Sequence, residues 1–364
     1  MITFDGFQKV KGLCYGVNFK DSKKPPVVCD RRSLSTPHGF FFGTPGSGKT
    51  ELMKKEIMLV LRQTKDKVYV IDTTGEFVKM AESDGYKSRV VRPLPGGKGD
   101  LINPLDLLNE ESYPMYTENV FDTAEEIISF LLNTPLIPNQ SAVIQKGLRT
   151  LFKPFLNQLD KSGDKSDRVN NPDLNDLRLI LSKEPDPEAA KIADVLHSCS
   201  ALFGKTSLSI ESDTRLVIYD ISKMGILSRV WYLMCLKDIE NRIYESRDDT
   251  YKWVYMSDLY AITHNNFRNS TIRRMYKTMR LYGGVLTGEV QNYEMLITPD
   301  LRCLINNSGF MVFFNQAAYD RQLISEYSGI CDEDLSMITD ATTGMGFILA
   351  GKELFPFDAK FSTI

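Results

Sequence analysis

A glycine-rich loop of eight residues, GTPGSGKT at 43–50, carries the strongest chemical signal in the sequence. It fits the pattern G-x-x-x-x-G-K-[ST] in full, and it lies between the apolar run HGFFF and a helical pattern, as the motif requires. Glycines let backbone N–H groups turn toward phosphate oxygens, and the start of the helix adds partial positive charge. We therefore expect a nucleoside triphosphate to bind at Gly43, Thr44, Pro45, Gly46, Ser47, Gly48, Lys49 and Thr50.

Two side chains of this loop have defined roles in the pattern. Lys49 is expected to reach the β- and γ-phosphates, and the Thr50 hydroxyl is expected to bind Mg²⁺. The N-K-x-D motif with which GTPases usually read the base is absent from the sequence. ATP and Mg²⁺ are therefore the expected cofactors.

The loop has to be held by a buried sheet, and the sequence contains the strands for one. Short β-branched and aromatic runs alternate with helical patterns, which predicts an α/β fold with a doubly wound, mostly parallel sheet. The length, the late strands and a helical segment favour a RecA-like P-loop NTPase of the motor type. The expected strands are 38–42, 67–74, 88–94, 215–222, 252–259, 283–290, 310–316 and 346–351.

Residues 109–204 interrupt this alternation, because four helical patterns follow one another there without a strand-like run. We interpret them as an all-helical insertion, since four helices are too many for one crossover; a set of crossover helices is the alternative. The ATPase core then comprises 36–108 and 205–364. Residues 1–35 are expected to form a lead-in segment that packs on the core.

Charge and composition exclude several classes of protein. Among 364 residues, 44 Lys and Arg accompany 47 Asp and Glu, so the net charge is −3 and bulk charge does not indicate DNA binding, although a local basic groove stays open. No apolar run approaches the ~18–20 residues of a membrane span. The six cysteines form no C-x-x-C pair and the three histidines are scattered, so no metal cluster of these residues is expected. We expect a soluble, intracellular protein.

Beyond the loop, short motifs occur in a fixed order over nearly the whole chain. Only the phosphate loop is specific by itself. The ordered set resembles the C-terminal ATPase domain of type IV secretion and conjugation ATPases, the CagE/TrbE/VirB class, and most of all its branch in conjugative elements of Gram-positive bacteria. The segments are YGVN (15–18), DRRSL (30–34), the loop, VIDTTGEF (70–77), INPLDL (102–107), RLVIYDI (215–221), MRLYGGVLTGEVQN (279–292), NSGFMVFFNQAAYDRQ (307–322) and TTGMGFILAGKELFPF (342–357).

The resemblance implies an ATP-hydrolysing motor domain that energises assembly or substrate transfer. It implies a cytoplasmic protein at the inner face of the cytoplasmic membrane, with other secretion components as partners and a homo-oligomer such as a hexamer. Full members carry a long region before this domain, so the chain is expected to correspond to their ATPase half. Two alternatives stay open: a HerA/FtsK-like or coupling-protein-like DNA translocase, and a nucleotide-binding switch with weak catalysis.

The resemblance also assigns roles to polar residues near strand ends. Gln291 matches the residue that senses the γ-phosphate and could orient the attacking water, with a surface glutamine as the alternative. Asp72 and Glu76 match a D-x-x-x-E pair beside the nucleotide, although Asp72 could equally cap a turn. Arg280 and Arg321 match arginines that could act on the nucleotide of a neighbouring subunit; surface or salt-bridged arginines are the alternative.

One strand departs from the family pattern. The run WVYMSDLY, 253–260, should end in Asp-Glu, where Asp holds Mg²⁺ and Glu activates water, but Ser257 and Asp258 stand there. Ser257 carries no charge, and the Asp258 carboxylate is one methylene shorter, a displacement of about 1.5 Å. Slow hydrolysis is therefore expected; in another register Asp258 itself is the metal ligand. The expected metal-binding positions are Thr50, Ser257 and Asp258.

Glu289 is a candidate substitute for the missing carboxylate. It precedes Gln291 by two residues, so both side chains would point to one face of a regular strand, and the family usually has an uncharged residue at this position. We hypothesise that Glu289 supplies the carboxylate that the Ser257 strand lacks.

The basic segment RNSTIRRMYKTMR, 268–280, is expected to be a helix. Ile272, Met275 and Met279 would form its apolar stripe, with arginines on a solvated face. A subunit interface and a DNA contact are the alternatives.

Overall fold

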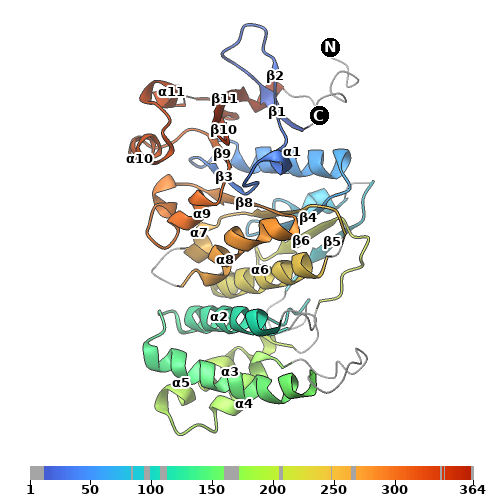
Figure 1. Cartoon of the computed structure of the whole chain (residues 1–364), viewed down its shortest axis with the longest axis vertical. Helices are drawn as coiled ribbons and strands as arrows, with labels where there is room; N and C mark the ends of the chain where they lie inside the picture. The colour runs from blue at the N-terminus through green and yellow to red at the C-terminus, as the bar shows by residue number, and fades with distance from the viewer. Residues whose placement is uncertain are drawn as a thin grey trace.

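Eleven strands form one sheet in the part of the chain that the structure describes, with helices on both faces (Figure 1). The computed structural model describes residues 12–82, 85–93, 99–106, 113–159, 172–204, 208–246, 248–263, 268–336, 338–339 and 341–361. The strands are β1 (Leu13–Val17), β2 (Pro26–Cys29), β3 (Gly39–Phe42), β4 (Lys67–Asp72), β5 (Ser88–Val91), β6 (Leu216–Asp220), β7 (Lys252–Met256), β8 (Gly284–Val290), β9 (Phe310–Phe313), β10 (Met345–Ala350) and β11 (Glu353–Asp358). The helices are α1 (Lys49–Gln63), α2 (Tyr113–Leu132), α3 (Pro138–Leu159), α4 (Leu174–Leu181), α5 (Pro187–Ser198), α6 (Ser228–Glu245), α7 (Tyr260–Thr263), α8 (Ser270–Thr278), α9 (Arg302–Asn306), α10 (Ala318–Ser328) and α11 (Asp332–Ser336).

The strand order is β2-β1-β11-β10-β9-β3-β8-β7-β4-β6-β5. The strands from β9 to β5 in this order pair in parallel, whereas β10, β11, β1 and β2 are antiparallel. The predicted α/β fold with a mostly parallel sheet is confirmed, and each of the eight expected strands is present as one of β3 to β10. Strands β1, β2 and β11 lie toward one edge of the sheet and are only partly buried, so they lack the continuous apolar runs that marked the others.

The strand that leads into the phosphate loop lies inside the parallel block. All four residues of β3 are buried, and β9 and β8 flank it in parallel register. Because parallel strands end at the same edge of a sheet, the loop after β3 emerges beside the carboxyl ends of β8, β7 and β4.

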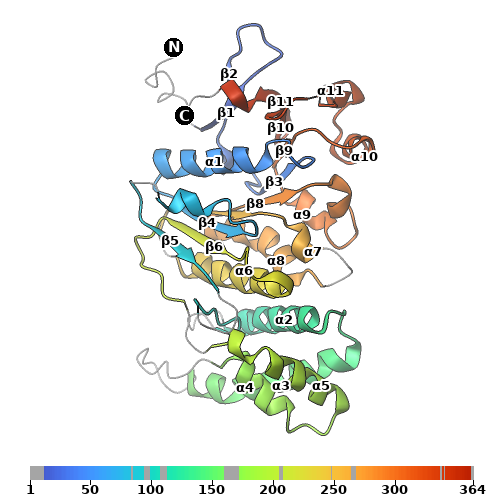
Figure 2. The same cartoon turned by 180° about the vertical axis from the view of Figure 1, so that it is seen from behind.

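Two hydrophobic cores lie on opposite faces of the sheet. Phe41 packs in the same cluster as Ile57 of α1, whereas Phe40 and Phe42 belong to the cluster on the other face. There Tyr276 of α8 stacks on Phe40 at a centroid distance of 5.1 Å. Helices α6 and α8 cover this second face, and α2 to α5 form a further layer beyond them (Figures 1 and 2).

The helical layer is tied to the core by a carboxylate of α2. Glu126 is fully buried and accepts hydrogen bonds from the Ser270 hydroxyl at 2.6 Å and from the Thr271 backbone N–H at 3.3 Å. These are donors of the first turn of α8, so Glu126 caps that helix from a neighbouring element.

The predicted apolar stripe is present, because Ile272 and Met275 of α8 and Met279, the residue that follows this helix, are all buried. The expectation of a solvated arginine face is wrong for Arg274. Its Nε donates to Glu240 of α6 at 2.7 Å, and this glutamate is completely buried. The arginine therefore joins two helices instead of facing water.

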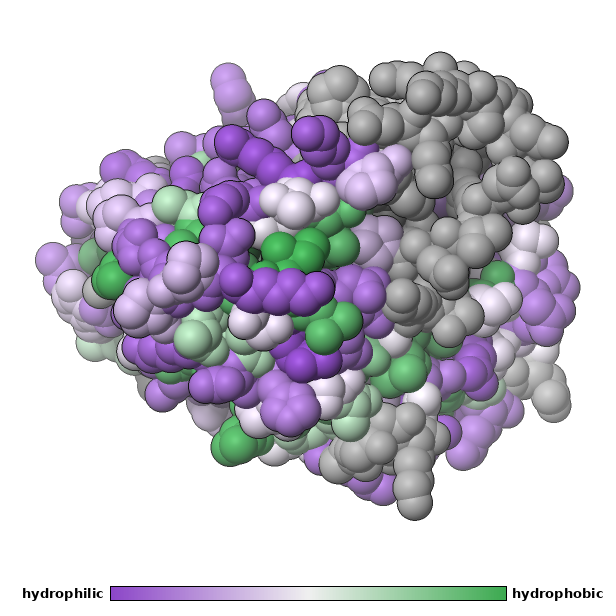
Figure 3. All heavy atoms as spheres, turned by 90° about the horizontal axis from the view of Figure 1, so that it is seen from below, coloured by the Kyte–Doolittle hydropathy of each residue, from purple (hydrophilic) through white to green (hydrophobic). Residues whose placement is uncertain are grey.

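The described residues between β5 and β6 contain helices α2 to α5 and no strand. Their position agrees with the proposed insertion at 109–204, whose limits lie partly outside the described residues; the division into domains stays a prediction. The end of the molecule formed by this layer, seen from below in Figure 3, mixes hydrophilic side chains with small apolar patches. Across the residues described, no helix has the length and apolar character needed to cross a membrane.

The lead-in segment adds a buried arginine to the core, beside apolar residues of β1 and β2. Arg31 is fully buried, and its guanidinium contacts both carboxylate oxygens of Glu56 in α1, at 3.0 and 3.1 Å. The same group donates to the Pro37 carbonyl at 2.8 Å and lies 4.6 Å from the Phe310 ring centre. The DRRSL motif therefore has a structural explanation, which is to fasten this segment between α1 and the sheet. Residues 1–11 lie outside the described residues.

Candidate functional site

The phosphate loop is anchored at its base to both neighbouring strands. The Gly43 N–H donates to the Val290 carbonyl at the end of β8, at 3.3 Å. The Thr44 N–H donates to the Asn315 carbonyl, just beyond β9, at 3.0 Å. These bonds fix the direction in which the loop leaves the sheet and so the position of α1.

The glycines of the loop are required by its geometry. Gly46 and Gly48 have φ angles of 76° and 106°, in the left-handed region that glycine adopts without strain. A Cβ atom on Gly43 would lie 2.5 Å from the Ser47 hydroxyl. That hydroxyl is buried without a hydrogen-bond partner among the described residues. An orphaned hydroxyl within a turn at a helix N-terminus suits a phosphate oxygen as ligand.

Lys49 lies folded over the loop that precedes it. Its ammonium group donates to the carbonyls of Gly43 and Thr44, at 2.6 and 3.1 Å. Burial lowers the pKa of Lys49, and the nearby carboxylates of Glu289 and Asp258 oppose that shift. A buried cation at this point can exchange its carbonyl partners for phosphate oxygens.

Glu289 is brought to the loop from β8. Its Oε1 accepts a hydrogen bond from the Thr50 hydroxyl at 3.1 Å and lies 4.0 Å from the Lys49 ammonium. Its side chain is 14% exposed, and burial raises its pKa, while Lys49 and the bond from Thr50 act in the opposite direction. Lys49, Thr50 and Glu289 therefore form one contiguous polar cluster at the start of α1.

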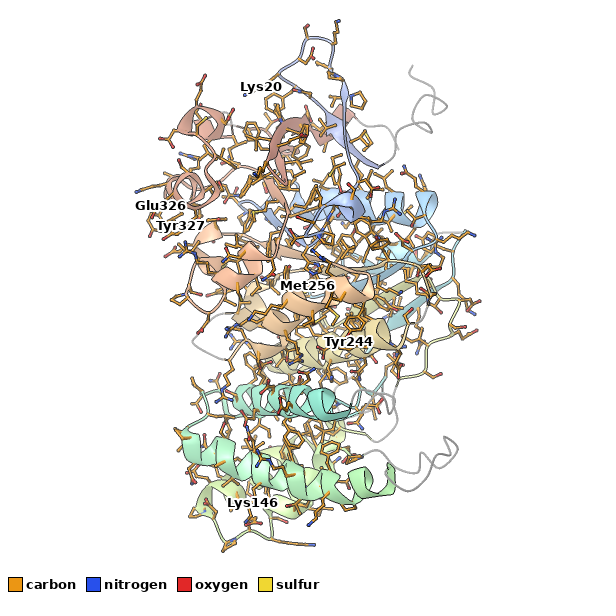
Figure 4. The ribbon with its side chains drawn as sticks, viewed as in Figure 1. Lys20, Lys146, Tyr244, Met256, Glu326 and Tyr327 are labelled. Atoms are coloured by element: carbon orange, nitrogen blue, oxygen red, sulfur yellow. The ribbon has the colours of Figure 1, made fainter. Side chains whose placement is uncertain are left out.

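The end of β7 is built differently. The Ser257 hydroxyl donates to the Ile71 carbonyl at 2.9 Å and accepts from the Thr73 N–H at 3.0 Å, so it ties β7 to β4. Asp258 follows as an exposed residue with φ of 45°, a conformation that Asp tolerates better than most residues. Its charge acts on both Lys49 and Glu289. Met256, the last residue of β7, lies in the middle of the molecule (Figure 4).

Asp72 is fully buried at the end of β4 and organises the turn that follows. One carboxylate oxygen accepts from the backbone N–H groups of Thr74 and Gly75, and the other accepts from that of Phe77. This is the turn-capping arrangement that the sequence left open as an alternative. Glu76 is exposed and pairs with Lys54 of α1 at 3.2 Å.

Gln291 lies at the same edge as the phosphate loop. It directly follows Val290, the last residue of β8, and is exposed. The polar cluster of Glu289 and the exposed amide of Gln291 therefore come from one strand end beside the loop. The role of Gln291 toward a γ-phosphate stays a prediction.

The two candidate arginine fingers lie in different places. Arg280 is exposed before the first residue of β8 and donates to the Ser35 carbonyl. The seven residues of β8 span about 20 Å, so Arg280 is at the opposite edge from the loop and could serve only another subunit's site. Arg321 lies in α10, which follows β9 at the loop edge, and donates to the Gln316 carbonyl at 2.6 Å.

A C-terminal segment that the sequence analysis did not assign to the site covers the loop. The Gly344 N–H donates to the Ser47 carbonyl at 2.9 Å, and the Thr343 hydroxyl donates to the Gly46 carbonyl at 3.1 Å. A groove of about 480 Å³ runs from Gly48 along α1 and is walled by this segment. The only signal for it in the sequence is the Thr-Thr-Gly turn before β10, within the 342–357 segment.

The oxygen donors present fit a magnesium ion that is shared with a nucleotide. Among the described residues, no group of three or more His, Cys, Asp or Glu side chains could hold a metal ion by itself. Magnesium in nucleotide sites, however, is bound by one or two protein oxygens together with phosphates and waters. The Thr50 hydroxyl and the Glu289 carboxylate, 3.1 Å apart, are such a pair.

Comparison with known proteins finds one matching family model and several similar structures. Residues 27–185 match the family model of the type IV secretion-system coupling protein DNA-binding domain. The structure is similar to that of VirB4 of Thermoanaerobacter pseudethanolicus, with a TM-score of 0.79, 17% identity and 97% of each chain covered. No curated protein sequence matches the chain.

The bacterial conjugative coupling protein TrwB is also similar. Its unbound form gives a TM-score of 0.59 at 13% identity, covering 98% of this chain and 90% of that one. TrwB in complex with ADP and Mg²⁺ gives a TM-score of 0.60 at 12% identity, with the same coverage. These likenesses show a shared RecA-like fold, and with the family model they support the family that the ordered motifs predicted. The Gram-positive branch stays a prediction.

Proposed function

Because the family model and the shared fold support a type IV secretion ATPase, we propose that this chain binds and hydrolyses ATP as a motor domain of a conjugative transfer system. The observation that carries the proposal is the phosphate loop in its working context. It emerges from a buried central strand, places Lys49 over its own carbonyls, and has a hydroxyl and a carboxylate side by side at the start of α1.

The chain's own residues have separate tasks in this proposal. Backbone N–H groups of the loop and the Lys49 ammonium bind the phosphates, and Thr50 contributes a ligand to Mg²⁺, which supplies charge stabilisation when bound. The groove from Gly48 along α1 is placed to take the nucleoside end. In this proposal Asp258 and Gln291, both exposed at the loop edge, orient the attacking water.

The secretion context rests on similarity. We infer partners among other components of the system, a location at the inner face of the cytoplasmic membrane, and a homo-oligomer. Arg280 lies at the far edge of the sheet, so in this proposal it would act only on the nucleotide of a neighbouring subunit.

ATP hydrolysis in the presence of Mg²⁺, measured over a range of protein concentrations, tests the activity. Lys49→Ala removes the cation that contacts the loop, and we expect turnover to fall on the order of 10²-fold or more. A specific activity that rises with protein concentration would support completion of the site by a neighbour. Nucleotide binding without turnover above the Lys49→Ala background would favour a switch function instead.

A DNA translocase is the second candidate, because the matching family model describes the DNA-binding domain of coupling proteins. The experiment that separates the two adds double-stranded DNA to the same assay. Stimulation that disappears steeply with salt would favour a translocase. Turnover that is indifferent to DNA would favour the secretion motor.

A further inference from the structure

We propose that Glu289 holds the magnesium ion of this site, in place of the aspartate that β7 lacks at position 257. The proposal rests on the nucleotide-binding function proposed above and assigns its metal site to a different strand. In the family pattern the acidic ligand comes from the strand that corresponds to β7; here the structure moves it to β8.

The first argument is the contact itself. Glu289 Oε1 is 3.1 Å from the Thr50 hydroxyl, which is the protein oxygen that the phosphate-loop pattern assigns to Mg²⁺. A carboxylate within one hydrogen bond of a metal-binding hydroxyl can bind the same ion directly or through its water shell. Carboxylate and hydroxyl oxygens are the hard ligands that Mg²⁺ prefers.

The second argument is the order of the strands. Glu289 pairs in register with Phe41 of β3, so it lies on the strand directly beside the one that feeds the loop. Strand β7 lies one strand farther away, a spacing of about 4.8 Å. The Thr287 hydroxyl, two residues earlier on β8, contacts Arg31 of the α1-side core, so this face of the strand is the one toward α1. A glutamate at position 289 therefore reaches the loop without crossing another strand.

The third argument is that the Ser257 hydroxyl is already hydrogen-bonded to β4 and to the turn after it. Its hydroxyl both donates to β4 and accepts from the turn after β4, and the residue is 2% exposed. A hydroxyl that carries no charge and already donates one hydrogen bond and accepts another is a weak ligand for a cation. The replacement of Asp by Ser at this position is thus accompanied by a carboxylate one strand closer to the loop.

Glu289 could instead serve only as the buried partner of Lys49. The distances distinguish these roles, because the Lys49 ammonium is 4.0 Å away and makes its short hydrogen bonds to loop carbonyls, whereas the close contact of Glu289 is with Thr50. If Glu289 served only as the partner of Lys49, neutralising it would leave the Mg²⁺ dependence of nucleotide binding unchanged. If Glu289 is a metal ligand, neutralising it weakens that dependence.

The test measures how much Mg²⁺ strengthens binding of a non-hydrolysable ATP analogue, by titration calorimetry in EDTA and in Mg²⁺. For Glu289→Gln, which keeps the shape and an acceptor for Thr50, we expect the enhancement by Mg²⁺ to fall at least about tenfold, with affinity in EDTA retained. Mn²⁺ bound beside the analogue, followed by electron paramagnetic resonance, should be lost in parallel. The matched control is Glu184→Gln, a carboxylate in the helical layer that pairs with Lys146 of α3 at 2.6 Å and should leave both readouts unchanged.

The double variant Ser257→Asp with Glu289→Gln provides the reciprocal test. It returns the carboxylate to β7, and we expect it to recover a large part of the lost enhancement. Full enhancement by Mg²⁺ in Glu289→Gln would overturn the proposal. Absence of analogue binding in the unaltered protein, with or without Mg²⁺, would overturn the proposed function itself. If thermal unfolding shows that Glu289→Gln is not folded, Glu289→Ala, which also removes the carboxylate, replaces it, and an unchanged metal dependence there would also overturn the proposal.

Discussion

The ends of β7 and β8 lie side by side at the edge where the phosphate loop emerges, yet they are built for different tasks. At the end of β8, Glu289 is mostly buried and contacts Thr50 and Lys49. At the end of β7, Ser257 is bonded to β4, and only the following residue, Asp258, carries a charge at the surface. A missing acidic residue in one strand is therefore not by itself proof of a dead site, because a neighbouring strand can present a carboxylate to the same loop.

The largest effect is expected from Asp258→Asn, which should distinguish the catalytic role of Asp258 from the metal-binding role of Glu289. Asp258→Asn removes the charge but keeps the size and the tolerance for a left-handed backbone. We expect turnover to fall roughly 10²- to 10⁴-fold, the usual contribution of a general base, while the enhancement of analogue binding by Mg²⁺ stays intact. Steady-state turnover and calorimetry on the same preparation provide the two readouts. Loss of the Mg²⁺ enhancement in Asp258→Asn would mean that Asp258 takes part in metal binding as Glu289 does.

A smaller effect is expected from Ser257→Ala, and it should appear in stability. The variant removes the hydrogen bonds from the Ser257 hydroxyl to the Ile71 carbonyl of β4 and from the Thr73 N–H of the following turn to that hydroxyl, so this partly buried N–H loses its acceptor. We expect a loss of about 1–2 kcal/mol in the free energy of unfolding, measured by urea denaturation, with the metal dependence of nucleotide binding unchanged. A change in that dependence would mean that the serine is a metal ligand after all.

The smallest effect concerns the other end of β8, where His38 accepts a hydrogen bond from the Leu286 N–H at 3.1 Å. Burial, together with Arg31 and Arg280, lowers the pKa of His38 to about 3. A folded-state pKa below the unfolded value of ~6.5 stabilises the protein above pH 6.5, and this contribution is lost as the pH falls toward 3. Between pH 7.5 and 5.5 the unaltered protein should lose about 1 kcal/mol more than His38→Asn. Urea denaturation at both pH values measures this difference. An equal loss of unfolding free energy in the unaltered protein and in His38→Asn would contradict the lowered pKa of His38.

Local patterns account for much of the fold. Most of the strands from β3 to β10 are short, mainly apolar runs, and the phosphate loop is contiguous in sequence, so both can be recognised without knowledge of the tertiary structure. The apolar stripe of α8 follows from helical spacing alone. The fold class and the nucleotide loop were predictable for this reason, whereas the short, half-exposed strands near one edge of the sheet were not.

Contacts between distant residues were decided only by the tertiary structure. Thr50 and Glu289 are 239 positions apart and meet because β8, the fifth strand in sequence after β3, pairs beside it. The packing of distant elements also places Arg31 in the core against Glu56, and it sets Arg274 against Glu240 instead of in water. Residue types and periodicity determine which segments form strands and helices, because those depend on neighbours along the chain. Which strands become neighbours depends on the packing of all elements together, and this decided which carboxylate reaches the loop.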